Sequence, residues 1–211
     1  GTVNIVTVNL SGSGTIKSNG GGNGNGSGGG GGRIAVTYTG AFTLSEQNIY
    51  AVGGTGYYGS PGGNGTVYLN RHGQANGDLI IDGFGNSTPS DTSRIPGGYT
   101  FDNITLRNSA RAVADESINV TNKLLITGNS ILTHSGALES GLVINTAVLQ
   151  VDAGSLIDVT GRGYSGGRGW HEQGRTLGNI YAGSDGSGGS YGGVGAGYQG
   201  RSAGLVYGDA K

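Results

Sequence analysis

The chain has 211 residues, a net charge of −1 and no cysteine or methionine, and only 12% of its residues are charged. This composition excludes disulfides, cysteine-ligated metal and thiol catalysis, and it offers no basic surface for nucleic acid or for an anionic membrane. No apolar run approaches the roughly 20 residues that a membrane-spanning helix needs, so we expect no insertion into a membrane.

Glycine dominates the chain, and most of its 49 glycines are concentrated in three tracts, residues 20–32, 53–65 and 161–204. The rest of the sequence is apolar, β-branched and alternating, which is typical of strands. At this length the chain can hold one sizeable core. We therefore expect a single strand-built repeat domain, residues 1–211, that displays the three glycine-rich tracts.

Short strand-like segments recur along the chain with similar spacing. In each copy three residues are followed, after a glycine or polar corner, by a second short apolar segment. The copies are residues 8–10 with Ile16, 42–44 with Ile49, 124–126 with Leu132, and 149–151 with Ile157.

The glycine tracts occupy equivalent places in this repeat. The first lies between Ile16–Asn19 and Arg33–Tyr38, and the second between Ile49–Val52 and Thr66–Leu69. The third is followed by 205–207. Coils of roughly 20–30 residues without helical periodicity predict a parallel β-helix, right-handed by the usual habit, with the tracts inserted at one corner.

One face of each strand in such a coil points into an apolar interior. We expect these residues inside: Val3, Ile5, Val8, Leu10, Ile34, Val36, Phe42, Leu44, Val67, Leu69, Ile104, Leu106, Ile126, Val143 and Val151. An all-β sandwich of short, evenly spaced strands is the competing architecture. The β-helix is favoured because the insertions recur at one corner and the hairpin signals lie mostly inside the tracts.

Glycine tracts held side by side can take an extended threefold conformation and form lateral backbone hydrogen bonds, as in a polyglycine II-like bundle, because no Cβ separates the backbones. Mobile, solvated linkers are the alternative. Aromatic residues inside the tracts favour order, since flexible linkers seldom carry them. They are Tyr57, Tyr58, Tyr164, Trp170, Tyr181, Tyr191 and Tyr198.

The densest chemical cluster is Trp170-His171-Glu172, with Arg168 and Arg175 nearby. A metal site needs three or four ligands at defined spacing, so we expect neither a metal nor a cofactor. Trp170 and His171, together with the tyrosines of the tracts, are candidates for stacking on a sugar or for contact with another subunit. The alternative is that Trp170 only packs against the glycine tract.

The acidic residues offer two further candidates, Asp78 with Asp82 and Asp152 with Asp158. A glycosidase needs two carboxylates facing each other across a sugar, about 5–10 Å apart. Corner capping and solvation are the favoured interpretation of both pairs. We therefore do not expect an enzyme.

Several segments, taken in order, resemble a known class of sequence. They are GTVNIVTVNLSGSGTIKSNGGG, GGGGGRIAVTY, GDLIIDGFGN, YTFDNITLRNSARAV, GSLIDVTGRGYSGG, GSYGG and VYGD. Together they resemble the glycine-rich β-helical repeat regions of very large secreted or surface adhesin-like proteins, mostly bacterial, over nearly the whole chain. The resemblance implies an extracellular location, a parallel β-helix and tandem repetition, and it implies no established reaction.

Neither Thr2–Leu10 nor 205–211 carries the capping helix, proline or charge cluster that natural proteins use to blunt strand edges. We expect these segments to pair with further copies of the chain through Val3, Ile5, Val8, Leu205, Val206 and Tyr207. The expected function is an extracellular structural or adhesive module that assembles head-to-tail into a fibre or surface filament. The alternatives are a carbohydrate- or receptor-binding tip, an ice-binding protein or a polysaccharide-degrading enzyme, with surface glycans as possible partners.

Overall fold

The structure is a computed structural model, which describes residues 1–22, 26–56, 60–85, 93–167, 172–197, 199–200 and 203–204. The described part is all-β with mostly parallel strand pairing, and its helical residues are confined to two three-residue 3-10 turns, Glu46–Asn48 and Leu177–Asn179. No helix in this part has the length and apolar character of a membrane span.

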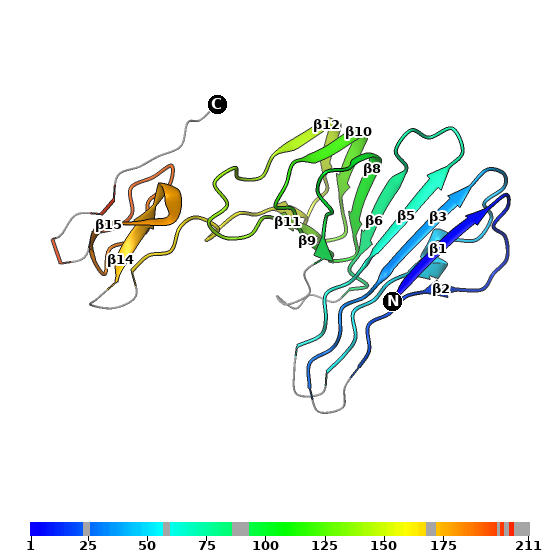
Figure 1. The fold of residues 1–211 in the computed structure, drawn as a ribbon, viewed down its shortest axis with the longest axis horizontal. Coiled ribbons are helices and arrows are strands. Elements are labelled where there is room, and N and C mark those ends of the chain that lie inside the picture. Colours follow the sequence, from blue (N-terminus) through cyan, green and yellow to red (C-terminus); the bar gives the residue numbers. More distant parts are fainter. Residues whose placement is uncertain are drawn as a thin grey trace. The chain divides into compact units, whose positions relative to one another are not determined.

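Contacts divide the chain into two compact units (Figure 1). The first unit contains residues 1–133 and 142–158, and the second contains residues 134–141 and 159–211. The first unit holds both aliphatic cores. A single domain over residues 1–211 stays a prediction, and each unit is described by itself below.

The first unit is built on a seven-stranded sheet with the order β1-β3-β5-β6-β8-β10-β12. All neighbours are parallel except β5 and β6, which are antiparallel. Parallel neighbours require a long connection between them, and these connections are the coils that the repeats predict. The strands are β1 (Thr2–Thr7), β3 (Arg33–Tyr38), β5 (Thr66–Arg71), β6 (Asp78–Asp82), β8 (Thr100–Arg107), β10 (Ile118–Ile126) and β12 (Ile144–Val151).

Shorter strands within the connections form two smaller parallel sheets. One has the order β2-β4 and the other β13-β11-β9-β7. We call β1 to β5 the first stack and β6 to β13 the second stack. The short strands are β2 (Ile16–Lys17), β4 (Ile49–Tyr50), β7 (Ser93–Arg94), β9 (Arg111–Val113), β11 (Ile131–Thr133) and β13 (Leu156–Ile157).

The two stacks have separate cores on opposite faces of the seven-stranded sheet. Along β5, Val67 and Leu69 belong to the core of the first stack, whereas Tyr68 packs against the core of the second. Along β6, Ile80 belongs to the first core and Leu79 to the second. Because successive residues of a strand point to opposite faces, the sheet is shared and the cores lie on its two sides. The described residues therefore form no single closed coil.

A tight turn between β5 and β6 reverses the chain. Gly73 and Gly77 have φ of 90° and 68°, in the left-handed region that favours glycine. The carboxylate of Asp102 on β8 accepts hydrogen bonds from the backbone N–H of Asn76 and of Gly77, at 3.3 and 3.2 Å. This buried carboxylate fixes the turn against the second stack, and the repeat alignment gave no sign of the reversal.

The repeat alignment is confirmed in the second stack and is partly wrong in the first. Residues 124–126 and 149–151 are aligned as expected, because they pair in register in β10 and β12. In the first stack Leu10 bridges to Phe42, whereas the alignment placed it opposite Leu44. The difference is two residues, so the expected inward face is kept.

Burial confirms most of the expected interior residues. Those that are buried are Ile34, Val36, Leu44, Val67, Leu69, Ile104, Leu106 and Ile126. Those that are half-buried are Val3, Ile5, Leu10 and Phe42. The prediction is wrong for Val8, Val143 and Val151, which are 63%, 38% and 42% exposed. Val8 lies beyond the end of β1, and the other two lie next to or on the edge strand β12.

Candidate functional site

The first two glycine tracts leave and rejoin the first stack at the same corner. Ile16 pairs with Ile49 where the tracts begin, and Arg33 pairs with Thr66 where they end. Between these points the described parts of the tracts run next to one another (Figure 1). They form four segments, residues 18–22, 26–32, 51–56 and 60–65.

Hydrogen bonds from segment 26–32 recur every third residue. Gly28 and Gly31 donate their backbone N–H groups to the carbonyls of Ser60 and Gly63, at 3.0 and 2.9 Å. The period of three is that of a polyproline II-type helix, which turns once in three residues. One side of the segment is thus bonded to residues 60–65, the part of the second tract that returns to the stack.

On other sides, the same segment forms hydrogen bonds with two more segments. Gly29 and Gly32 donate to the carbonyls of Gly21 and Ser18, at 2.8 and 2.7 Å, again three residues apart. The carbonyl of Gly29 accepts from the N–H of Gly54 at 2.7 Å. Segment 26–32 is therefore bonded to three other segments, whereas a strand in a sheet has at most two neighbours.

Glycine is required here by close approach between backbones. A Cβ at Gly28 would lie 1.8 Å from the carbonyl oxygen of Gly54, and one at Gly65 would lie 1.7 Å from that of Gly32. Neither Gly28 nor Gly65 has φ in the left-handed region. Glycine is therefore required at these positions by the lack of space for a Cβ and not by the backbone conformation. At Gly21, in the first tract, a Cβ would meet nothing within 4 Å.

The last coil of the second stack exposes the positions that the preceding coil buries. Leu124 and Leu132 are 0% exposed, whereas their register partners Leu149 and Ile157 are 46% and 39% exposed. These are the same inward-facing positions in consecutive coils. In the described part of the first unit, no further coil follows β12 and β13.

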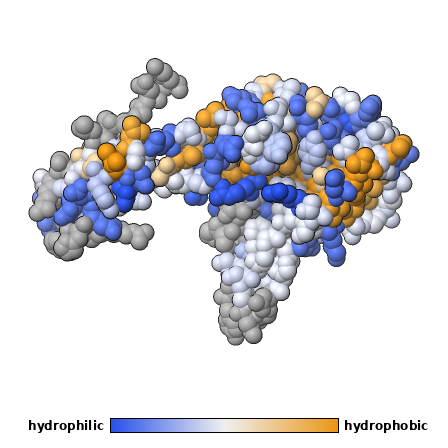
Figure 2. Space-filling model, viewed as in Figure 1, coloured by the Kyte–Doolittle hydropathy of each residue, from blue (hydrophilic) through white to orange (hydrophobic). Residues whose placement is uncertain are grey.

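At the other edge of the sheet, β1 is less covered than its neighbour β3. Val3 and Ile5 pair with Ile34 and Val36 of β3, but they are only half-buried where their partners are fully buried. Figure 2 shows apolar residues gathered on the surface over β1. The end residues expected at the other terminus, Leu205, Val206 and Tyr207, lie outside the described residues.

The aromatic residues proposed as ligand contacts have different environments. Tyr181 is 58% exposed, and the guanidinium of Arg175 lies 4.3 Å from its ring centroid. Tyr191 is 40% exposed. Tyr164 is buried, so its ring packs inside the second unit, and its role as a contact residue stays a prediction. The other candidates lie outside the described residues: Tyr57, Tyr58, Trp170, His171 and Tyr198.

The second unit has a polar interior built around Tyr164. Among the described residues of this unit, Tyr164 is the only large apolar side chain that is buried. Its phenol donates to the carboxylate of Glu139 at 2.7 Å, and the N–H of Gly178 donates to the same oxygen at 2.9 Å. Ser187 and Ser190 are also buried, and their hydroxyls accept backbone hydrogen bonds. The antiparallel pair β14 (Gln173–Thr176) and β15 (Ile180–Asp185) completes the unit.

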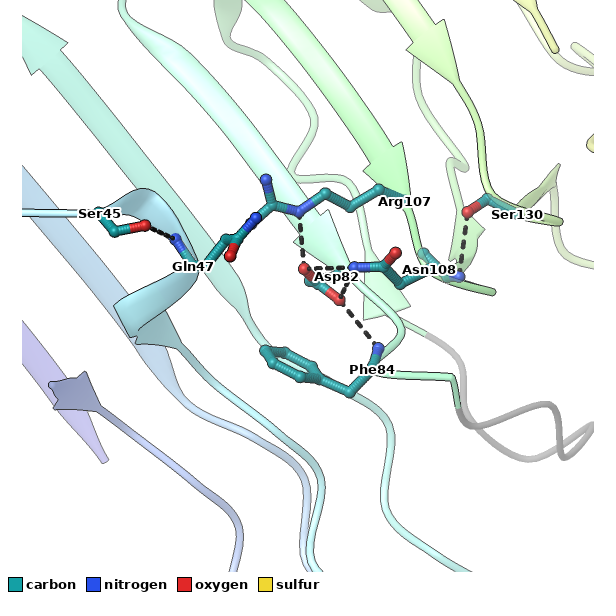
Figure 3. Close-up of polar contacts among 8 residues, drawn as sticks. Ser45, Gln47, Asp82, Phe84, Arg107, Asn108 and Ser130 are labelled. Carbon is teal, nitrogen blue, oxygen red and sulfur yellow. Dashed lines mark hydrogen bonds and ion pairs between the residues drawn. The ribbon is translucent and has the colours of Figure 1, made fainter.

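The carboxylate of Asp82 is surrounded by donors from neighbouring coils (Figure 3). Arg107 Nε donates to it at 2.6 Å, and Asn108 Nδ2 lies 3.1 Å from both oxygens. The backbone N–H of Phe84 donates to it at 2.9 Å. These bonds connect β6 to β8 and the following corner, which is a structural use of the carboxylate.

The other acidic candidates are also hydrogen-bonded to neighbours. Asp78 accepts from Asn103 Nδ2 at 2.7 Å. At the corner after β12, hydrogen bonds from the side chains of Thr127 and then Gln150 hold the pKa of Asp152 below its ordinary value of 3.8. Each of these hydrogen bonds stabilises a corner or a pair of strands, which agrees with the structural role favoured for the acidic residues.

A small surface pocket of about 330 Å³ lies where β3 and β5 begin. Arg33 and Glu116 line it, and Arg94 forms an ion pair with Asp115 at its side. None of the aromatic residues expected to stack on sugars lines this pocket. Among the described residues, no group of three or more potential metal-ligating side chains is found.

Comparison of the chain with family models, with curated proteins and with solved structures gives no match. The candidate site is therefore defined by geometry alone. In the described part of the chain it consists of the two edge strands of the seven-stranded sheet, β1 and β12, together with β13, the edge strand of the four-stranded sheet. Sequence reasoning identified the first end and missed Val148, Leu149, Leu156 and Ile157 at the second, although the repeat alignment placed two of them in the last copy.

The environment of Tyr164 makes the second unit sensitive to alkaline pH. Burial, and then the hydrogen bond with Glu139, raises the pKa of Tyr164 above its ordinary value of 10.0. A raised pKa contributes stability that is complete below pH 10.0 and is lost as the pH rises through the folded-state value. We expect the second unit of the wild-type protein to unfold more readily above that pH.

Tyr164→Phe should weaken this dependence and cost about 1 kcal/mol at neutral pH through the lost hydrogen bond. The measurement is denaturant unfolding at pH 7 and above pH 10, followed by the fluorescence of Trp170, the one tryptophan of the chain. Identical losses of stability in Tyr164→Phe and wild type over this pH range would contradict the expectation.

Proposed function

We propose that this chain is an extracellular structural module that assembles head-to-tail into a fibre or surface filament. The observation that carries the proposal is the uncapped end of the second stack, where Leu149 and Ile157 lie in the ladder positions that the previous coil buries completely. In the finer architecture that we propose, each stack is a piece of parallel β-helix and the first two tracts form a polyglycine II-like bundle.

The energetics of the open end support association. Removing apolar surface from water stabilises by about 25 cal/mol per Å². Large apolar side chains that are half-exposed in the isolated chain would contribute the rest of this free energy when a second molecule covers them. Edge strands also carry unpaired backbone groups that template pairing with another chain. Among the described residues, β12 has β10 as its one partner in the sheet and carries exposed apolar side chains.

The glycine bundle supports a structural role. Its segments are joined by hydrogen bonds between backbone groups, with the side chains of Asn19 and Asn64 accepting two more, so a rigid flank is formed from residues that are usually flexible. The chain also lacks cysteine and methionine, the two residues most easily oxidised, which suits a long-lived extracellular material.

The adhesin-like resemblance and a carbohydrate-binding role stay predictions. Trp170 and His171, on which sugar stacking depends, lie outside the described residues, and the exposed tyrosines of the second unit do not line the pocket beside Arg33 and Glu116. We therefore keep the structural module as the single proposed function.

The proposal is tested by sedimentation velocity over a wide range of protein concentration, with electron microscopy of the most concentrated sample. We expect a monomer in dilute solution and progressively longer linear species as concentration rises. A protein that stays monomeric and folded at every concentration would show that the ends do not associate.

A further inference from the structure

The two strands at the internal reversal have apolar side chains on both faces, and each face joins a different core. On β5, Val67 faces the first core and Tyr68 packs against the second. On β6, Ile80 faces the first core and Leu79 the second. An ordinary strand such as β8 instead alternates buried apolar residues with polar ones. On β5 and β6 the sheet is therefore covered by a core on each side.

The two edge strands of the sheet have the same two-faced pattern. On β1, Ile5 faces the first core, whereas Val6 points to the opposite face and is 78% exposed. On β12, Leu149 continues the ladder of the second core, whereas Val148 points to the opposite face and is 50% exposed. Among the described residues, neither Val6 nor Val148 belongs to a core.

The direction of the strands allows the edges to meet as β5 and β6 do. β1 runs parallel to β5, β6 runs antiparallel to β5, and β12 runs parallel to β6 through β8 and β10. β12 is therefore antiparallel to β1. If a second copy repeats the orientation of the first, its β1 meets β12 as an antiparallel neighbour.

We propose that β12 of one copy pairs antiparallel with β1 of a second copy and so repeats the β5–β6 junction between molecules. This inference rests on the proposed function and names its partner surface. In the pair, Val148 faces the same side as Val3 and Ile5 of the second copy, as Ile80 does inside the chain. Val6 of the second copy joins the ladder that ends at Leu149, as Tyr68 joins the second core.

This contact is heterologous, because different surfaces of two identical chains meet, and repetition of it gives an open filament. A parallel arrangement, with the second copy turned over, is the other way to continue the sheet. It would cover Leu149 but would leave Val6 and Val148 side by side on an outer face. The antiparallel junction is the one that uses both exposed valines.

The test uses Val6→Glu and Val148→Glu, each of which puts a carboxylate into one half of the junction. Both valines are at least half-exposed, and Val148 pairs in register with Lys123, so the fold of the isolated chain should tolerate either change. Val194→Glu, at a residue of the second unit that is 71% exposed, is the matched control. Circular dichroism melting establishes that all three variants are folded.

Each junction variant alone should lose about 100-fold or more in association constant, because an unpaired carboxylate is buried at the contact. Val194→Glu should assemble as the wild type does. An equimolar mixture of the two junction variants should form a 1:1 pair that grows no further, since the intact β12 of one meets the intact β1 of the other. Sedimentation velocity measures all four samples.

Two results would overturn the inference while the proposed function stands. One is wild-type-like assembly of either junction variant, which parallel stacking predicts. The other is a mixture that stays monomeric, or a junction variant that forms a closed dimer by itself, while wild type assembles. Failure of the wild type to assemble would instead remove the proposed function.

Discussion

Replacement of Gly65 by alanine should lower the melting temperature of the first unit markedly. The new Cβ would lie 1.7 Å from the carbonyl oxygen of Gly32, and neither backbone is free to retreat. The N–H of Gly65 donates to Ala51 at 2.7 Å, and the carbonyl of Gly32 accepts from Thr66 at 3.2 Å. Overpacking of this kind costs about 1–3 kcal/mol or more, and each kcal/mol corresponds to about 2–4 °C for a unit of this size.

Gly21→Ala is the matched control for Gly65→Ala. Its Cβ meets nothing within 4 Å and its φ lies outside the left-handed region, so alanine fits without strain. Alanine also reduces the conformational freedom of the unfolded chain, which stabilises by about 0.4–1 kcal/mol. Thermal unfolding followed by circular dichroism should therefore show opposite signs for the two variants. Equal and small effects would mean that the glycine segments are not held against one another.

Leu124→Ala should destabilise the first unit far more than Leu149→Ala does, although the two leucines are partners in one ladder. Leu124 is 0% exposed, and its truncation leaves a cavity that costs about 2–5 kcal/mol. Leu149 is 46% exposed at the end of the stack, so its truncation in dilute protein should cost roughly 1 kcal/mol or less.

Denaturant unfolding of the dilute monomer measures both values for this pair. The comparison is strict because the residue type, the strand position and the inward direction are the same in the two variants. Equal destabilisation would show that Leu149 is buried in the isolated chain and that the second stack is capped. That outcome would remove the main support for assembly through β12.

Much of the first unit could be predicted from the sequence, because its repeats are local and regular. The recurrence of apolar residues predicted the pairing of residues 124–126 with 149–151, and the placing of the tracts predicted the corner where Ile16 pairs with Ile49. Both inferences depend on the period of two along a strand and on the equal spacing of successive coils.

The reversal at β5–β6 could not be predicted in the same way. It depends on a turn with two left-handed glycines and on Asp102, which lies well beyond the turn in sequence and accepts two of its N–H groups. Such a contact has no local pattern. The one visible sign was the continuous apolar run Leu79–Ile81, which fits a strand between two cores as well as an ordinary buried strand.

Only one half of the candidate site, the β1 edge, was expected from the sequence. Val3 and Ile5 were expected at an open end because no capping residue surrounds them in the sequence. The exposure at β12 was missed because Val151 was placed inside by its ladder position. A periodic pattern assigns the direction in which a side chain points, but only the next coil in space decides whether it is covered.

The most direct test of the account is electron microscopy of concentrated protein at a resolution that separates the strands. We expect filaments in which the seven-stranded sheet runs on from one chain to the next, with β12 of each molecule antiparallel to β1 of its neighbour. Separate particles at all concentrations, or filaments in which both edges face solvent, would contradict it.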